Sequence, residues 1–99
     1  MLQEVKNALR VASDAFDADL TQLINAALLD LSVAGVTAGT DPETITDPLV
    51  IRAVCTYCAA NRISLDPQQR AWLKASYDEQ KAQMQTATGY TDWGDGNEG

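Results

Sequence analysis

The sequence contains no histidine, so it lacks the side chain that most often serves as a general base near neutral pH. Proton-transfer catalysis would need a carboxylate, lysine or cysteine with a strongly shifted pKa. The carboxylates of Asp14, Asp17 and Asp19 lie at the start of a predicted helix, where capping accounts for them. A phosphate-binding glycine loop and a serine nucleophile elbow are also missing. We expect no enzymatic activity, no cofactor and no bound metal.

Cysteine occurs only at Cys55 and Cys58, as a single CxxC pair. Structural zinc takes about four ligands, and one chain cannot supply them without a second cysteine pair or a histidine. A redox-active pair usually opens a helix that follows a strand, because the helix terminus lowers the thiol pKa. This pair lies inside an apolar helical stretch instead. We therefore predict two reduced, packed side chains, and a redox enzyme built on the pair is the alternative.

Basic residues are few: seven lysines and arginines stand against fourteen acids, and the net charge is -7. With so few basic residues, the protein cannot gain binding free energy from counterion release by wrapping duplex DNA. A negatively charged surface would, however, suit a channel wall past which DNA slides without binding. Long apolar runs are absent too, since no stretch approaches the roughly 20 residues that span a bilayer. The first residues do not resemble a signal peptide. We expect a cytoplasmic protein without membrane contact.

Helical periodicity is what the sequence does contain. The predicted helices are residues 2–11, a stretch from Asp14 or Asp17 to a stop at Gly35, residues 48–63, and a stretch opened by Asp66 and Pro67. Asp47 with Pro48, like Asp66 with Pro67, places a capping carboxylate before a proline at the first helical position. The expected fold class is all-α: a compact bundle of about four helices over residues 1–85 and a flexible acidic tail over residues 86–99.

The second predicted helix has two apolar faces. Its core stripe consists of Leu20, Leu23, Ile24, Ala27, Leu28 and Leu31. On the far side, where a monomeric surface helix should be charged, the sequence places Ala26, Leu29 and Val33. These residues predict a second contact, and scattered surface apolar residues are the alternative.

The third and fourth helices have different apolar patterns. The third is apolar over most of its circumference, as expected of a central helix, with Leu49, Val50, Ala53, Val54 and Tyr57 on one side and Ile51, Cys55 and Cys58 on the other. The fourth has a narrow core stripe of Leu73, Tyr77, Gln80 and Met84. Trp72 points about 100° away from that stripe. It either packs near Leu65 or anchors a contact with another chain.

Two segments outside the helices are candidates for partner contacts. Residues 35–46 form a loop with two glycines, a proline and several threonines, at the upper end of usual connection lengths. The acidic tail carries two aromatic residues, Tyr90 and Trp93, which would let it order on a partner. A tail without a role is the alternative.

The order of segments resembles the small head-tail connector proteins of long-tailed bacteriophages. The similar stretches are residues 4–11 (EVKNALRV), 17–27 (DADLTQLINAA) and 47–57 (DPLVIRAVCTY), together with Trp72 and residues 77–81 (YDEQK). The resemblance covers residues 2–85 and rests on ordered similarity along the chain. The CxxC pair and residues 90–99 lie outside it.

The resemblance implies a structural virion protein, made in the bacterial cytoplasm and located at the head-tail junction. It implies a homo-oligomeric ring of about a dozen copies that contacts the portal protein and tail completion proteins and lets DNA pass transiently and without specificity. The expected neighbour contact consists of Ala26, Leu29, Val33 and Trp72. The expected portal or tail contact consists of Thr37, Thr40, Thr44, Tyr90 and Trp93. The alternative function is a small DNA-packaging or regulatory protein, similar to a small terminase.

Overall fold

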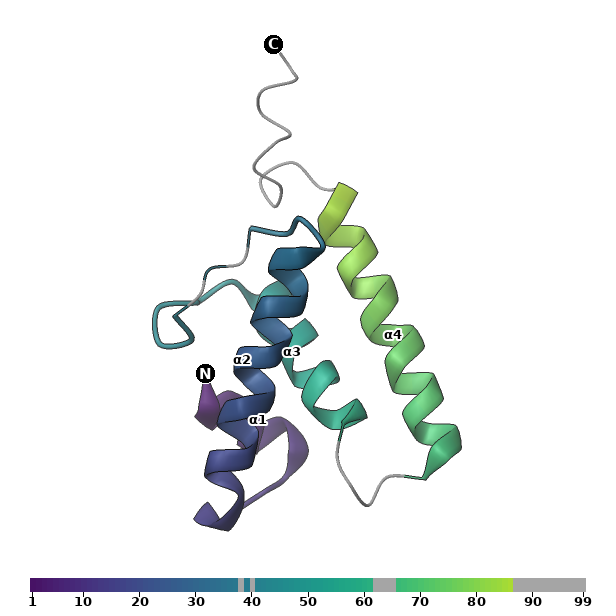
Figure 1. Ribbon diagram of the computed structural model, residues 1–99. Coiled ribbons are helices and arrows are strands. Elements are labelled where there is room, and N and C mark those ends of the chain that lie inside the picture. Colours follow the sequence, from purple (N-terminus) through teal and green to yellow (C-terminus); the bar gives the residue numbers. More distant parts are fainter. Residues whose placement is uncertain (38, 40, 62–65, 87–99) are drawn as a thin grey trace.

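The computed structural model describes residues 1–37, 39, 41–61 and 66–86. Its elements are α1 (Leu2–Leu9), a short 3-10 helix η1 (Asp14–Phe16), α2 (Asp17–Val33), α3 (Pro48–Ala60) and α4 (Pro67–Thr86) (Figure 1). No strand occurs within the described ranges, and the all-α prediction is confirmed. None of these helices is long and apolar enough to cross a membrane. Residues 87–99 lie outside the described part, so the character of the tail stays a prediction.

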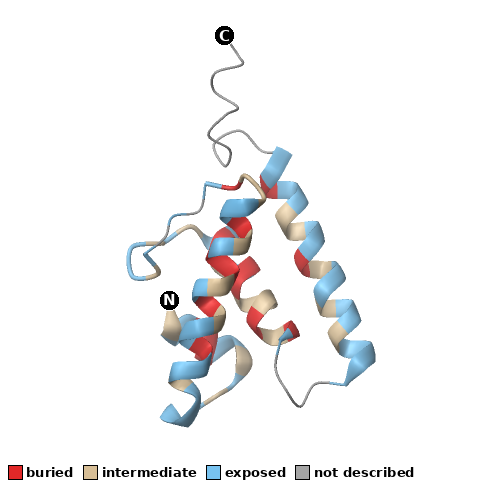
Figure 2. Ribbon diagram, viewed as in Figure 1, coloured by how far each residue is buried: buried red, intermediate tan, exposed pale blue. Residues whose placement is uncertain are grey.

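Helix α3 lies at the centre of the bundle, between α4 on one side and α1 and α2 on the other (Figure 1). The buried face of α2 is turned toward α3 (Figure 2). The hydrophobic core draws on all four helices and on the loop after α2: Val5, Leu20, Ile24, Ala27, Leu28, Leu31, Val36, Val50, Ala53, Val54, Cys58, Tyr77 and Met84. The predicted central position of this helix is confirmed.

Two of the predicted helix boundaries are confirmed by their hydrogen bonds. The side chain of Asp47 accepts a hydrogen bond from the backbone N–H of Leu49 at 2.9 Å, and Pro48 opens α3. After α2, Gly35 has a φ of 89°. This left-handed residue lets the N–H of Val36 reach the carbonyl of Leu31 at 2.9 Å, which satisfies a free carbonyl of the last turn.

Two details of the sequence prediction were wrong. Helix α1 ends at Leu9, because Arg10 takes a left-handed conformation with a φ of 59°. Leu49 is 50 % exposed, because it lies in the first turn of α3 on the side turned away from the core. Cys58 is fully buried, in agreement with the prediction that the cysteines are packed side chains.

The expected capping role of Asp14 and Asp17 was wrong too. Helix α2 begins after Phe16 without a side-chain cap. Asp14 and Asp17 instead lie 2.8 Å from the ammonium of Lys6, a residue of α1 that is only 7 % exposed. Contacts with Asp14 and then Asp17 raise the pKa of Lys6, and Lys6 in turn lowers the pKa of Asp14. This ion-pair cluster joins α1 to the start of α2.

Candidate subunit interface

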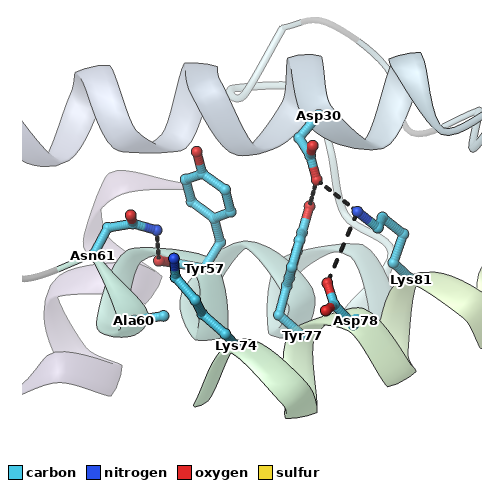
Figure 3. Close-up of a pocket in the computed structure, with 8 residues that line it drawn as sticks. All are labelled: Asp30, Tyr57, Ala60, Asn61, Lys74, Tyr77, Asp78 and Lys81. Atoms are coloured by element: carbon cyan, nitrogen blue, oxygen red, sulfur yellow. Dashed lines mark hydrogen bonds and ion pairs between the residues drawn. The ribbon is translucent and has the colours of Figure 1, made fainter. Parts of the chain in front are cut away.

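Helix α4 is joined to α2 by polar contacts. Asp30 of α2 accepts a hydrogen bond from the Tyr77 hydroxyl at 2.6 Å and one from the Lys81 ammonium at 3.1 Å (Figure 3). One turn further along both helices, the Gln85 side-chain amide donates to the Ala34 carbonyl at 2.9 Å. These three bonds link segments about 50 residues apart, and they align α2 and α4 in the same direction.

The same contacts set the protonation behaviour of the network. Burial opposes the ionisation of Asp30, but the hydrogen bonds from Tyr77 and Lys81 outweigh it, so the pKa of Asp30 is lowered. Burial and the bond to Asp30 raise the pKa of Tyr77. The Lys81 ammonium also lies 5.2 Å from the centre of the Tyr77 ring. At neutral pH the network therefore holds an ionised Asp30 carboxylate and a neutral Tyr77 phenol.

A pocket of about 330 Å³ opens between α2, α3 and α4 next to this network. Its lining residues are Asp30, Tyr57, Ala60, Asn61, Lys74, Tyr77, Asp78 and Lys81 (Figure 3). Helix α3 supplies the floor, where the Asn61 side chain donates to the Tyr57 carbonyl at 2.8 Å. The Tyr57 ring meets the Tyr77 ring edge-on, with centroids 5.2 Å apart. The pocket thus combines aromatic surfaces with charges of both signs.

The structure leaves two of the three predicted contact residues of α2 exposed on the surface. Leu29 is 65 % exposed and Val33 is 80 % exposed, whereas Ala26 is half-buried. The core stripe on the other side of the same helix is buried, except for Leu23, which is partly buried against the core. The predicted division of α2 into a core face and an outer apolar face is therefore confirmed, while the role of the outer face as a contact stays a prediction.

Trp72 lies apart from those residues. It is 73 % exposed on α4, so its side chain is free to contact another chain; Leu65, its predicted alternative partner, lies outside the described residues. Two residues along a helix correspond to about 200°, so Trp72 points about 160° away from Lys74, which faces the pocket beside α2. The structure therefore places Trp72 on the side of α4 that is turned away from the pocket.

The predicted portal and tail contacts are only partly described. Thr37 and Thr44 are exposed on the loop between α2 and α3. The hydroxyl of Thr44 donates to the carbonyl of Asp41 at 3.0 Å, which orders a turn of that loop. Thr40, Tyr90 and Trp93 lie outside the described residues.

The two cysteines lack the features of a reactive pair. Both thiols are free, Cys58 is fully buried, and Cys55 is partly buried. Burial raises the pKa of Cys58 to about 12 and also raises the pKa of Cys55, so little thiolate forms near neutral pH. In the described part of the chain, no group of three or more acidic, cysteine or histidine side chains is placed to hold a metal ion. Packing accounts for both cysteines.

The sequence analysis assigned no role to Lys81, which binds Asp30 in the structure. One signal was available, because Asp30 is an acid within an otherwise apolar helical stretch, beside its core stripe. A charge in that position needs a partner of opposite sign. The sequence could not say which lysine would supply it.

Comparison with known proteins agrees with this architecture. The sequence model of a family described as phage connector protein matches residues 1–91. Searches of curated proteins and of solved structures found no match. Connector proteins are structural components of the phage virion, associated with other head-tail proteins, and are not typically enzymes. Because the match spans nearly the whole sequence, the chain belongs to the phage connector protein family.

Proposed function

We propose that this chain is the subunit of a homo-oligomeric ring that joins the portal vertex of the phage head to the tail and lets DNA pass through its centre. The ring consists of about a dozen copies, related by rotation about one axis. Family membership supports the location, and the net charge of -7 supports a channel wall to which DNA does not adhere.

The observation that carries the proposal is the exposed apolar face of α2. Leu29 and Val33 are large apolar side chains, one turn apart, in a domain that already has a closed core. Adjacent exposed apolar side chains of this kind mark contact surfaces. A ring subunit needs two unlike surfaces, since head-to-tail contacts are heterologous, and Trp72 supplies an exposed aromatic side chain on a second side.

The remaining surfaces are assigned to the neighbours along the virion axis. Thr37, Thr40 and Thr44 of the loop between α2 and α3 face the portal protein or the tail completion proteins, together with Tyr90 and Trp93 of the tail. The alternative of a DNA-binding packaging factor has less support, because Lys74 and Lys81 line a pocket that also contains Asp30 and Asp78.

Replacing Leu29 with glutamate tests the assembly role. We expect the variant to sediment as a monomer at concentrations where the wild-type chain forms a large discrete oligomer, because the new carboxylate would have to lose its hydration in an apolar contact. Its melting temperature should stay close to that of the wild type, since Leu29 is outside the core.

Thr21→Glu is the matched control, because it adds the same charge to an exposed site at the other end of α2. This control should assemble as the wild type does. Unchanged assembly of Leu29→Glu would remove the outer face of α2 from the interface.

A further inference from the structure

We propose that neighbouring copies meet through α4: the outer stripe of α4 in one copy, Trp72 with Glu79, docks against the pocket between α2 and α4 of the next copy, where Glu79 pairs with Lys74. This inference rests on the proposed ring and names the surfaces that would form its subunit contact.

The outer stripe of α4 has the composition of a docking surface. Trp72 and Glu79 are seven residues apart, so they lie on one side of the helix, about 10.5 Å from each other along its axis. Both side chains are exposed, and no ion pair involves Glu79 within the described residues. The small side chain of Ala75 lies between them on the exposed surface and leaves room for close approach. A large aromatic anchor beside a charge is typical of interface centres.

The pocket side has the complementary composition. Lys74 and Lys81 are also seven residues apart, and both line the pocket. Lys81 is held by Asp30 at 3.1 Å, whereas the Lys74 ammonium has no acidic partner in the part of the chain that the structure describes. Lys74 of the pocket and Glu79 of the outer stripe are therefore complementary in charge. Such complementarity fixes the orientation of a contact and disfavours contacts in other orientations.

The size and the surroundings of the pocket also favour the outer stripe of a neighbouring copy as its occupant. A pocket of about 330 Å³ has room for a side chain of the neighbouring copy, and the Lys74 ammonium that lines it suits the Glu79 carboxylate. The pocket is continuous with the outer apolar face of α2, because Asp30 lies one turn from both Ala26 and Val33. A neighbour seated there would cover the apolar side chains that one copy alone leaves exposed.

The placement of the two surfaces suits a ring. Trp72 points about 160° away from Lys74 on the same helix, so one copy can offer its outer stripe to one neighbour and its pocket to the other. In a ring of about a dozen copies, successive subunits are rotated by only about 30°, and their α4 helices run in nearly the same direction. With Glu79 beside Lys74, the parallel direction places Trp72 about 10.5 Å further toward the start of the neighbour's α4, where it packs beside the pocket and not inside it.

Charge reversal in trans tests this contact. Lys74→Glu and Glu79→Lys should each raise the concentration for half-assembly by about tenfold or more, since each places like charges together at every contact. A 1:1 mixture should assemble as the wild type does, because each chain then meets a neighbour of complementary charge. The measurement is sedimentation velocity over a concentration series. Arg52→Glu and Glu43→Lys make the same charge changes at exposed sites elsewhere and should assemble normally.

The outcomes separate this contact from the ring itself. The α4 contact is overturned if the wild type assembles and the single variants assemble equally well. It is also overturned if the wild type assembles and the mixture of variants does not. Either result leaves the proposed ring in place. A wild type that stays monomeric at every concentration contradicts both. Recovery in trans also shows that the variants are folded. As a second readout, carbodiimide treatment of mixed isotope-labelled wild-type chains should join Lys74 of one copy to Glu79 of another.

Discussion

Replacing Ile24 with alanine is expected to lower the free energy of unfolding by about 2–5 kcal/mol. Ile24 is only 2 % exposed and lies in the core face that α2 turns toward α3, so the truncation removes apolar contacts and leaves a cavity. The total stability of a domain of this kind is about 5–15 kcal/mol, and the loss is a large share of it. Urea denaturation followed by far-ultraviolet circular dichroism measures the change.

Leu29→Ala is the matched control, five residues away on the opposite face of the same helix. The cost should be within about 0.5 kcal/mol, since Leu29 is 65 % exposed and its truncation opens no cavity in the core. Equal losses for the two alanine variants would contradict the division of α2 into a core face and an outer face.

Replacing Tyr77 with alanine is expected to cost about 3–5 kcal/mol, the range for truncating a large buried aromatic side chain. Tyr77 is buried in α4, meets Tyr57 edge-on, and donates to Asp30 across the gap to α2. Tyr77→Phe keeps the ring and removes only the hydroxyl, so its cost should be about 1 kcal/mol. Comparable costs for the two variants would mean that the hydrogen bond, and not the ring, holds α4 in place.

The cost of Tyr77→Phe should also depend on pH. The folded-state pKa of Asp30 is lowered, so ionised Asp30 stabilises the fold at pH values above its unfolded pKa of about 3.9. This contribution is lost as the pH falls through the lower folded pKa. The difference between wild type and Tyr77→Phe should therefore be smaller at low pH than at pH 7. Urea denaturation at both pH values provides the comparison.

The elements that are governed by local chemistry could be predicted from the sequence. Asp47 with Pro48 marked the start of α3, and Gly35 marked the end of α2, because caps and left-handed stops depend on residues a few positions apart. Helical phasing separated Ile24 from Leu29 for the same reason: the angle between two residues on a helix follows from their spacing.

The features that depend on packing between helices could not be predicted in this way. Asp30 meets Tyr77 and Lys81 only because α3 sets the distance between α2 and α4. Asp14 and Asp17 form ion pairs with Lys6, whereas their position in the sequence predicted that they would cap a helix. The same limit applies to the candidate interface. Phasing predicted the exposure of Leu29, but it left Trp72 either packed near Leu65 or exposed for another chain, because the surroundings of Trp72 depend on how α4 packs.

The most direct test of the proposed ring is the mass of the purified wild-type chain in solution, measured by sedimentation or native mass spectrometry over a range of concentrations. A ring subunit is expected to give one large discrete species of about a dozen subunits that appears as the concentration rises, with few intermediates, since a closed ring satisfies both surfaces of every copy. A monomer at all concentrations, or a dimer that grows no further, would contradict it.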